Sequence, residues 1–176
     1  RSAQPAPADV GWAARNGIRT VLSMRADGFG GDLLEREACA RHGLIFQRLV
    51  MLSRAAPSKE MLREAMAVLP QLEVPILVHC KSGADRAGLA AALYLIIVEG
   101  RPAAEAKRQL SFKYGHIERG KTGILDAFID AYAATGEAKG IDFSDWVETV
   151  YDPDALTAAF RSNVGADVLL TVLRRE

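Results

Sequence analysis

The strongest constraint on the fold is the stretch from Ile76 to Glu99, "ILVHCKSGADRAGLAAALYLIIVE". It opens with an apolar run typical of a buried parallel strand, continues through a short polar loop, and ends in a helix-like apolar run from Ala87. The loop therefore follows the carboxyl end of a strand, where open α/β sheets bind ligands, and precedes a helix, whose first N–H groups attract anions. The stretch predicts an anion-binding loop in an α/β fold.

The rest of the first half alternates between strand and helix patterns, which predicts an α/β fold with a central, mostly parallel sheet flanked by helices. We expect the strand before the loop to be a central strand, because it is apolar on both faces. Asp9, Asp32 and Ser58 are suited to cap the helices that follow them. The predicted strands cover residues 18–24, 44–50 and 74–80, and the predicted helices cover residues 9–16, 33–42 and 59–69.

Helical patterns dominate after the loop, over residues 87–99, 103–111 and 123–132. The character of the chain changes near residue 135, where "ATGEAKG" reads as a linker before a short helix and a further helix from Pro153. We therefore expect a catalytic domain over residues 1–135 and a helical extension, residues 136–176, packed on it. The chain opens on "RSAQPAP" without a methionine, so we expect the N-terminal part of the catalytic domain to be truncated.

The composition narrows the class of partner and compartment. The formal net charge is zero, which argues against bulk electrostatic binding to nucleic acid or to an anionic membrane. No apolar run has the length of a membrane span, so we expect no integral membrane segment. The two cysteines, Cys39 and Cys80, form neither a disulfide framework nor a metal-ligand pattern, so reduced thiols in the cytoplasm are the simplest interpretation.

Cys80 and Arg86 stand at the two ends of the loop, with five residues between them. That length lets the backbone curl so that its N–H groups point inward, while Arg86 can donate two hydrogen bonds to an oxyanion. Helix N-termini and neighbouring cations stabilise a thiolate, so we expect Cys80 to be ionised at neutral pH and nucleophilic toward phosphorus. A cysteine that merely packs would explain neither the loop nor the arginine.

The segment from His79 to Arg86 resembles the H-C-x5-R signature of the cysteine-dependent protein tyrosine and dual-specificity phosphatases. "RSAQP", "GIRTVLSMR" and "QLSFKYGHIERGKTGILDAF" are similar to segments of a bacterial branch of that superfamily. The resemblance implies hydrolysis of a phosphoprotein or of a small or lipid phosphate through a phosphocysteine on Cys80, with no metal or cofactor. It further implies that His79 braces the loop. The residues expected to bind substrate are Lys81, Ser82, Gly83, Ala84 and Arg25.

The general acid is the first departure from the family pattern. Many members carry an aspartate on a separate loop, but the matching segment here, "VMLSRAAPSKE", has none, and Glu60 is a poor substitute. Asp85 is the best candidate, because myotubularin-like lipid phosphatases resemble this chain in placing aspartate before the arginine. The alternative is that Asp85 only caps the next helix or steadies Arg86. Asp27 and Asp32 are reserve candidates.

Ala87 is the second departure, because the family usually has serine or threonine there to steady the departing sulfur. Its absence predicts a slow second step, a burst of leaving group, and faster turnover when threonine is introduced. Three other functions stay open: a non-catalytic phosphate-binding module, a phosphatase of lipid or inositol phosphates, and sulfur transfer or arsenate reduction.

Other polar residues give weaker signals. Arg54, His116 and Lys121 could line the pocket rim, although ordinary surface side chains are the more common outcome. Cys39 lies in a helical run and is expected to pack in the interior rather than to act with Cys80.

Overall fold

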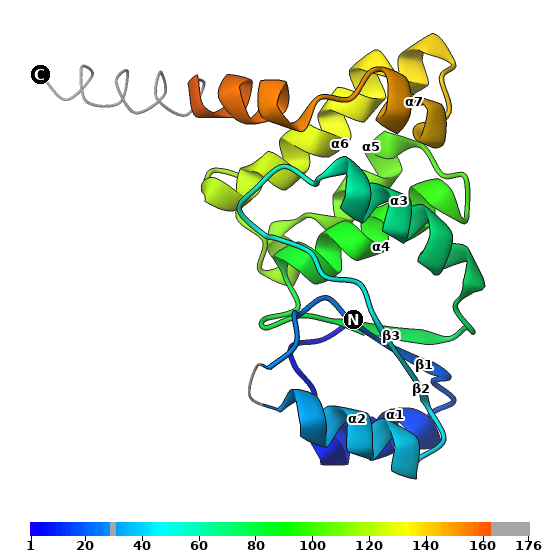
Figure 1. Cartoon of the computed structure of the whole chain (residues 1–176). Helices are drawn as coiled ribbons and strands as arrows, with labels where there is room; N and C mark the ends of the chain where they lie inside the picture. Colours follow the sequence, from blue (N-terminus) through cyan, green and yellow to red (C-terminus); the bar gives the residue numbers. More distant parts are fainter. Residues whose placement is uncertain (29–30, 163–176) are drawn as a thin grey trace, which may run out of the picture.

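Three short parallel strands form the sheet in the computed structural model, which describes residues 1–28 and 31–162 (Figure 1). They are β1 (Thr20–Ser23), β2 (Ile45–Arg48) and β3 (Ile76–His79), in the order β2-β1-β3. In register, Ser23 of β1 lies opposite Arg48 and His79. The prediction of parallel strands is confirmed, but the central strand is β1 rather than β3. On its other side β3 has the isolated bridge from His79 to Ser2.

Helices cover both faces of this sheet (Figure 1). On one face lie α1 (Pro7–Arg15) and α2 (Asp32–Arg41). The helices α3 (Lys59–Val68), α4 (Asp85–Ile97), α5 (Ala103–Ala106) and α6 (Ile124–Thr135) lie on the other side, followed by α7 (Phe143–Thr149). Short 3₁₀ segments cover Leu69–Gln71, Lys107–Gln109, Phe112–Tyr114, Lys121–Gly123 and Glu137–Lys139.

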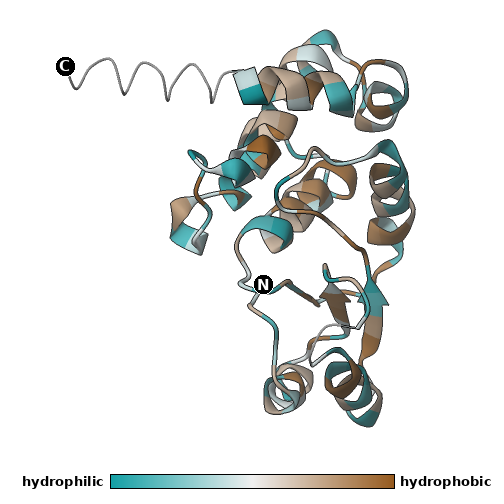
Figure 2. Ribbon diagram, turned by 60° about the vertical axis from the view of Figure 1, so that its left-hand side comes forward, coloured by the Kyte–Doolittle hydropathy of each residue, from teal (hydrophilic) through white to brown (hydrophobic). Residues whose placement is uncertain are grey.

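The sheet separates two hydrophobic clusters. Side chains alternate across a strand, so Val21 of β1 packs in the smaller cluster with α1 and α2, whereas Leu22 packs in the larger one. Apolar residues accordingly lie along the sheet and on inner sides of the helices (Figure 2). The larger cluster includes most of α4, which is why that helix reads as apolar nearly all round. This packing fixes the start of α4 relative to the end of β3.

Helix starts agree with the sequence pattern at one predicted cap, Ser58, and differ at the other two, Asp9 and Asp32. The Ser58 side chain accepts a hydrogen bond from the Met61 N–H at 3.2 Å, as predicted. Asp9 is not the N-cap of α1: the helix begins at Pro7, and the Asp9 carboxylate accepts a hydrogen bond from the Ala6 N–H at 2.9 Å. Proline at the first helical position explains the earlier start, because its fixed φ suits a helix and its missing N–H is not needed there. Asp32, also expected as a cap, is the first residue of α2, after the N-cap Gly31.

The segment after α6 packs through aromatic rings. The ring centres of Phe128 and Tyr151 lie 5.2 Å apart, and the Tyr151 hydroxyl donates a hydrogen bond to the Pro57 carbonyl at 2.7 Å. Residues 153–162 are helical, as expected from Pro153, and the rest of the expected extension, residues 163–176, lies outside the described residues. Within the described ranges, no helix has the length and apolar character needed to cross a membrane.

Candidate active site

The loop of residues 80–84 connects β3 to α4 and has a bent shape. Cys80 is 2% exposed, and its sulfur accepts a hydrogen bond from the Gly83 N–H at 3.3 Å. The N-cap of α4 is Ala84, whose side chain cannot accept a hydrogen bond from the first turn. The thiol therefore lies inside the curve of the loop, next to a helix start that favours negative charge.

Gly83 is required at this point for two reasons. Its φ is +80°, which side chains other than glycine rarely adopt. A Cβ there would also lie only 2.6 Å from the carbonyl carbon of Ser2. The N-terminal segment runs directly beneath the loop, where the Ser2 N–H bonds to the Val78 carbonyl at 3.0 Å and the Gln4 N–H to the Lys81 carbonyl at 3.4 Å. The loop is thus held in shape from below.

A chain of polar contacts supports the cysteine from the β3 side. His79 is fully buried, and its Nε2 lies 2.8 Å from Oε1 of buried Glu35 in α2, at ion-pair distance although the alignment falls short of a hydrogen bond. Gln4 donates to the other oxygen of Glu35 at 2.8 Å and accepts from Arg25 at 2.6 Å. The expected bracing by His79 is therefore compatible with its position, and Arg25 contacts Gln4 at the edge of this network.

The remaining loop residues differ in exposure. Lys81 and Ser82 are exposed, Ala84 is buried, and Arg86 is partly buried in the first turn of α4. Across residues 1–28 and 31–162, the Arg86 guanidinium forms no hydrogen bond or ion pair with another residue. A cation at a helix N-terminus with its donors unused can bind an anion there.

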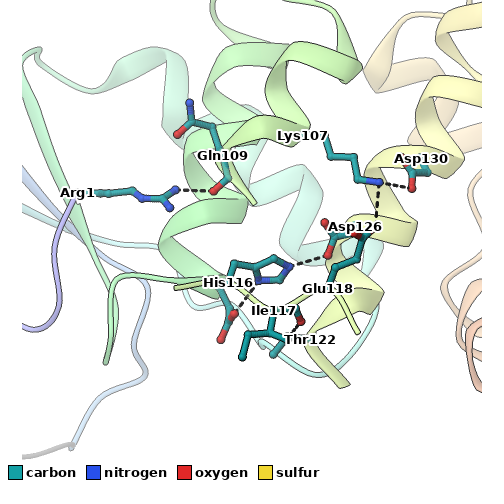
Figure 3. Close-up of polar contacts among 10 residues, drawn as sticks. Arg1, Lys107, Gln109, His116, Ile117, Glu118, Thr122, Asp126 and Asp130 are labelled. Atoms are coloured by element: carbon teal, nitrogen blue, oxygen red, sulfur yellow. Dashed lines mark hydrogen bonds and ion pairs between the residues drawn. The ribbon is translucent and has the colours of Figure 1, made fainter. Parts of the chain in front are cut away.

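Asp85 is not the N-cap of α4, and its side chain contacts His116 instead. Its Oδ1 lies 2.8 Å from Nδ1 of His116. On the other side of the ring, Nε2 of His116 lies 2.6 Å from Oδ2 of Asp126 (Figure 3). Desolvation by burial raises the pKa of Asp126, while its hydrogen bond to His116 opposes that shift. His116 is 2% exposed, so it is neither a surface residue nor a rim residue that reaches substrate.

The reserve candidates for the general acid are engaged elsewhere. Asp27 and Asp32 both pair with Arg48 at the end of β2. Glu60 is exposed on α3 beside Arg63. Neither arrangement points to proton transfer at Cys80.

Three further side chains lie where ordinary surface or core residues would. Arg54 and Lys121 are not in the interior. Cys39 packs in the smaller cluster as expected, and burial together with the nearby Glu35 carboxylate raises its pKa to about 11. Cys39 and Cys80 both carry free thiols.

Four residues near the loop escaped sequence reasoning: Arg1, Gln4, Glu35 and Asp126. Arg1 donates to the Gln109 carbonyl at 2.8 Å, and its guanidinium lies 3.7 Å from the centre of the Tyr114 ring. Burial lowers the pKa of Arg1, and the nearby Tyr114 and Cys80 oppose that shift. The available signals were the similarity of "RSAQP", which contains Arg1 and Gln4, and that of "QLSFKYGHIERGKTGILDAF", which contains Asp126, but neither similarity gave a role to these residues.

A family profile described as "PTP-SAK: Swiss Army Knife protein, DSP-PTPase phosphatase domain" matches residues 2–118, which include the loop and most of the chain that supports it. The chain belongs to this family of dual-specificity-type phosphatase domains. Cys80, Asp85, Arg86 and His116 lie within the matched range, whereas Arg1, Lys121 and Asp126 lie outside it. No protein of curated function has a matching sequence.

Solved structures of other phosphatases share the fold of this dual-specificity-type domain. TpbA of P. aeruginosa is 24% identical, with a TM-score of 0.57 over 90% of this chain and 83% of that one. A cysteine-to-serine variant of TpbA, solved in complex with pTyr, is 25% identical, with a TM-score of 0.54 over 77% of this chain and 85% of that one. PTPMT1 is 21% identical, with a TM-score of 0.55 over 78% of this chain and 92% of that one.

Proposed function

We propose that this protein hydrolyses phosphomonoesters through a phosphocysteine intermediate on Cys80, as a tyrosine or dual-specificity phosphatase of proteins. The observation that carries the proposal is the loop itself: the Cys80 sulfur accepts the Gly83 N–H, and at the start of α4 the Arg86 guanidinium is engaged by no other described residue. Such donors stabilise charge on a phosphoryl group during in-line transfer. The complex of a TpbA variant with pTyr supports phosphotyrosine as the substrate to test first.

The proposed reaction has two steps. The Cys80 thiolate attacks phosphorus, the bond to the leaving oxygen breaks, and that oxygen takes a proton from Asp85. Water then attacks the phosphocysteine, gives a proton to the Asp85 carboxylate, and displaces the sulfur as a thiolate. Arg86 and the backbone N–H groups of Lys81, Ser82, Gly83 and Ala84 would hold the phosphoryl oxygens throughout.

The proposal also assigns a role to Arg25, a cellular compartment and the bounds of the catalytic domain. Arg25 would act through Gln4, to which it donates a hydrogen bond. Free thiols are typical of reducing compartments, so we propose a cytoplasmic location from the two free cysteines. We also propose that residues 1–135 form the catalytic domain, with residues 136–176 as an extension packed on it.

Hydrolysis of p-nitrophenyl phosphate and of a phosphotyrosine peptide tests this function. Cys80→Ser should lower kcat/KM by about 10³-fold or more, because the nucleophile is lost, and acid quenching of the wild type should trap phosphate on Cys80. Cys39→Ser is the matched control and should keep most of the activity. Activity on neither substrate, or equal activity in Cys80→Ser, would contradict the proposal.

Ala87 predicts the relative speed of the two steps. It is fully buried in the first turn of α4 and offers no hydroxyl to the departing sulfur, so hydrolysis of the intermediate should be slower than its formation. Rapid-quench measurements should show a burst of leaving group, and a strictly linear time course would refute this. Because the site is buried, serine is a better replacement than threonine and should raise turnover by a few fold.

A further inference from the structure

His116 lies between two carboxyl groups from different helices. Asp85 belongs to the first turn of α4 and Asp126 to the first turn of α6, and the ring spans them with contacts of 2.8 Å and 2.6 Å. Figure 3 shows the His116 ring aimed at Asp126, with Lys107 and Glu118 nearby. Both ring nitrogens of His116 are therefore used by carboxyl groups, which leaves neither one for a substrate.

Each of these short contacts needs a hydrogen, because two acceptors cannot bond to each other. A neutral imidazole carries only one N–H, so either the ring is protonated on both nitrogens or one carboxyl group carries the second hydrogen. In both arrangements, three groups share two protons and the cluster carries one net negative charge. The two arrangements differ only in where one proton lies.

The cluster opens to solvent at one end. The side chains of His116 and Asp126 are 1% and 3% exposed, whereas that of Asp85 is 24% exposed. Asp85 also directly precedes Arg86 in the chain. One Asp85 oxygen is fixed by His116, so the other is available at the loop side of the cluster.

We propose that His116, held by Asp126, is a positioning residue that fixes Asp85 for proton exchange at the Cys80 loop. This inference rests on the proposed phosphatase function. The two protons in the His116 contacts stay there, so the acid uses a third proton, which the outer Asp85 oxygen takes from solvent before the reaction. In the first step Asp85 gives this proton to the leaving oxygen as the bond to phosphorus breaks, while its inner oxygen accepts the N–H of His116 Nδ1. In the second step Asp85 takes a proton from the attacking water as the phosphorus–sulfur bond breaks. His116 itself touches no substrate.

Burial and charge around Asp126 fit this role. Burial raises the pKa of Asp126, and its hydrogen bond to His116 opposes that shift. Glu118 raises the Asp126 pKa further, whereas Lys107, which also pairs with Glu118 and Asp130, lowers it. Asp126 is thus supported as the anchor of the ring.

A purely structural tie between α4 and residues 111–123 is the competing explanation. It would lower activity equally on all phosphate esters, because it would affect the whole loop. Loss of an acid acts selectively, since an acidic leaving group departs without a proton and a basic one does not. Leaving-group dependence therefore separates the two explanations.

The experiment compares 2,4-dinitrophenyl phosphate with phenyl phosphate in wild type, His116→Gln and His116→Asn. Asparagine places its amide near the position of Nδ1 and keeps a donor toward Asp85, whereas glutamine reaches the position of Nε2 and faces Asp126. In His116→Gln, kcat/KM for phenyl phosphate should fall about 10²-fold or more, with less than about 3-fold loss for the dinitrophenyl ester. His116→Asn should recover part of the loss.

Controls keep each outcome interpretable. His42→Gln alters an exposed histidine at the end of α2 and should change neither rate, while Asp85→Asn should show the same selective loss as His116→Gln. Asp126→Asn provides a second, milder variant should His116→Gln fail to fold. Equal losses on both esters, or none, would overturn the role of His116 while leaving the phosphatase intact. A wild type that hydrolyses neither ester would overturn the proposed function as well.

Discussion

His79 and His116 stand near the two ends of the same loop, and both are buried beside carboxylates. His79 contacts Glu35, which Gln4 connects to Arg25, so its partners lie under the sheet. His116 instead joins buried Asp126 to Asp85, the partly exposed residue next to Arg86. A buried histidine whose contacts stay inside the protein can support a loop, whereas one whose contacts emerge at the loop can influence a proton there.

Removing the anchor of His79 should have the largest effect on stability. Glu35→Ala leaves polar groups of His79 and Gln4 without their carboxylate partner, and each buried polar group that loses its partner costs roughly 1–3 kcal/mol. Urea denaturation should therefore show a large loss in the free energy of unfolding, while Glu37→Ala, exposed on the same helix, should change it by about 0.5 kcal/mol at most. The residual activity of Glu35→Ala should fall equally on both phenyl esters. A selective loss on phenyl phosphate would break the comparison between the two histidines.

Gly83→Ala tests whether the close contact between the loop and the Ser2 backbone holds the loop in shape. The added methyl group would meet the Ser2 backbone at 2.6 Å in a left-handed conformation, so stability should fall by about 2 kcal/mol and kcat/KM should fall on every substrate. Gly43→Ala is the matched control, because Gly43 has a φ of +67° but open space around it. It should lose only the roughly 1 kcal/mol that the left-handed backbone costs a residue with a side chain. Equal losses in the two variants would show that the Ser2 contact is unimportant.

The smallest effect concerns the pH dependence of stability at Asp126. Burial raises its folded pKa above the ordinary value, so the folded state holds this proton more tightly than the unfolded state does. The contribution to stability is therefore complete below the ordinary pKa and is lost as pH rises through the raised pKa, at roughly 1.4 kcal/mol for each pH unit that separates the folded and unfolded pKa values. Urea denaturation of wild type and Asp126→Asn between about pH 4 and 7 should show this decline only in the wild type. Parallel curves would contradict it.

Local features of the fold could be predicted from the sequence. The strands, the Cys80 loop and the Ser58 cap depend on neighbouring residues, so patterns and caps were sufficient. The apolar helix α4 was also predicted, but it begins at Asp85, two residues before the predicted start. The order of the strands could not be predicted from neighbouring residues. The apolar β3 looked central, yet β1 is flanked by strands on both sides, because the position of a strand depends on which distant strands pair with it.

The candidate site likewise contains some residues that the local sequence could predict and others that it could not. Cys80, Arg86 and Asp85 lie within one short segment; the spacing of Cys80 and Arg86 suggested their roles, and the resemblance to phosphatases with aspartate before the arginine suggested that of Asp85. Glu35 and Asp126 became visible only through contacts made in the folded chain. His116 looked like a surface residue because "KYGHIERGKTG" is polar, but carboxyl groups on both sides of the ring allow it to be buried.

The passage of Ser2 and Gln4 beneath the loop has a consequence for how the cradle opens. Ser2 and Gln4, which support the loop from below, are distant in sequence from the loop and α4. Detaching the first residues would therefore loosen the loop while α4 stays folded. Hydrogen exchange at the Gly83 amide would report this detachment as a low-energy local event. Any change that pulls Ser2 and Gln4 away from the loop should then weaken the binding of phosphate.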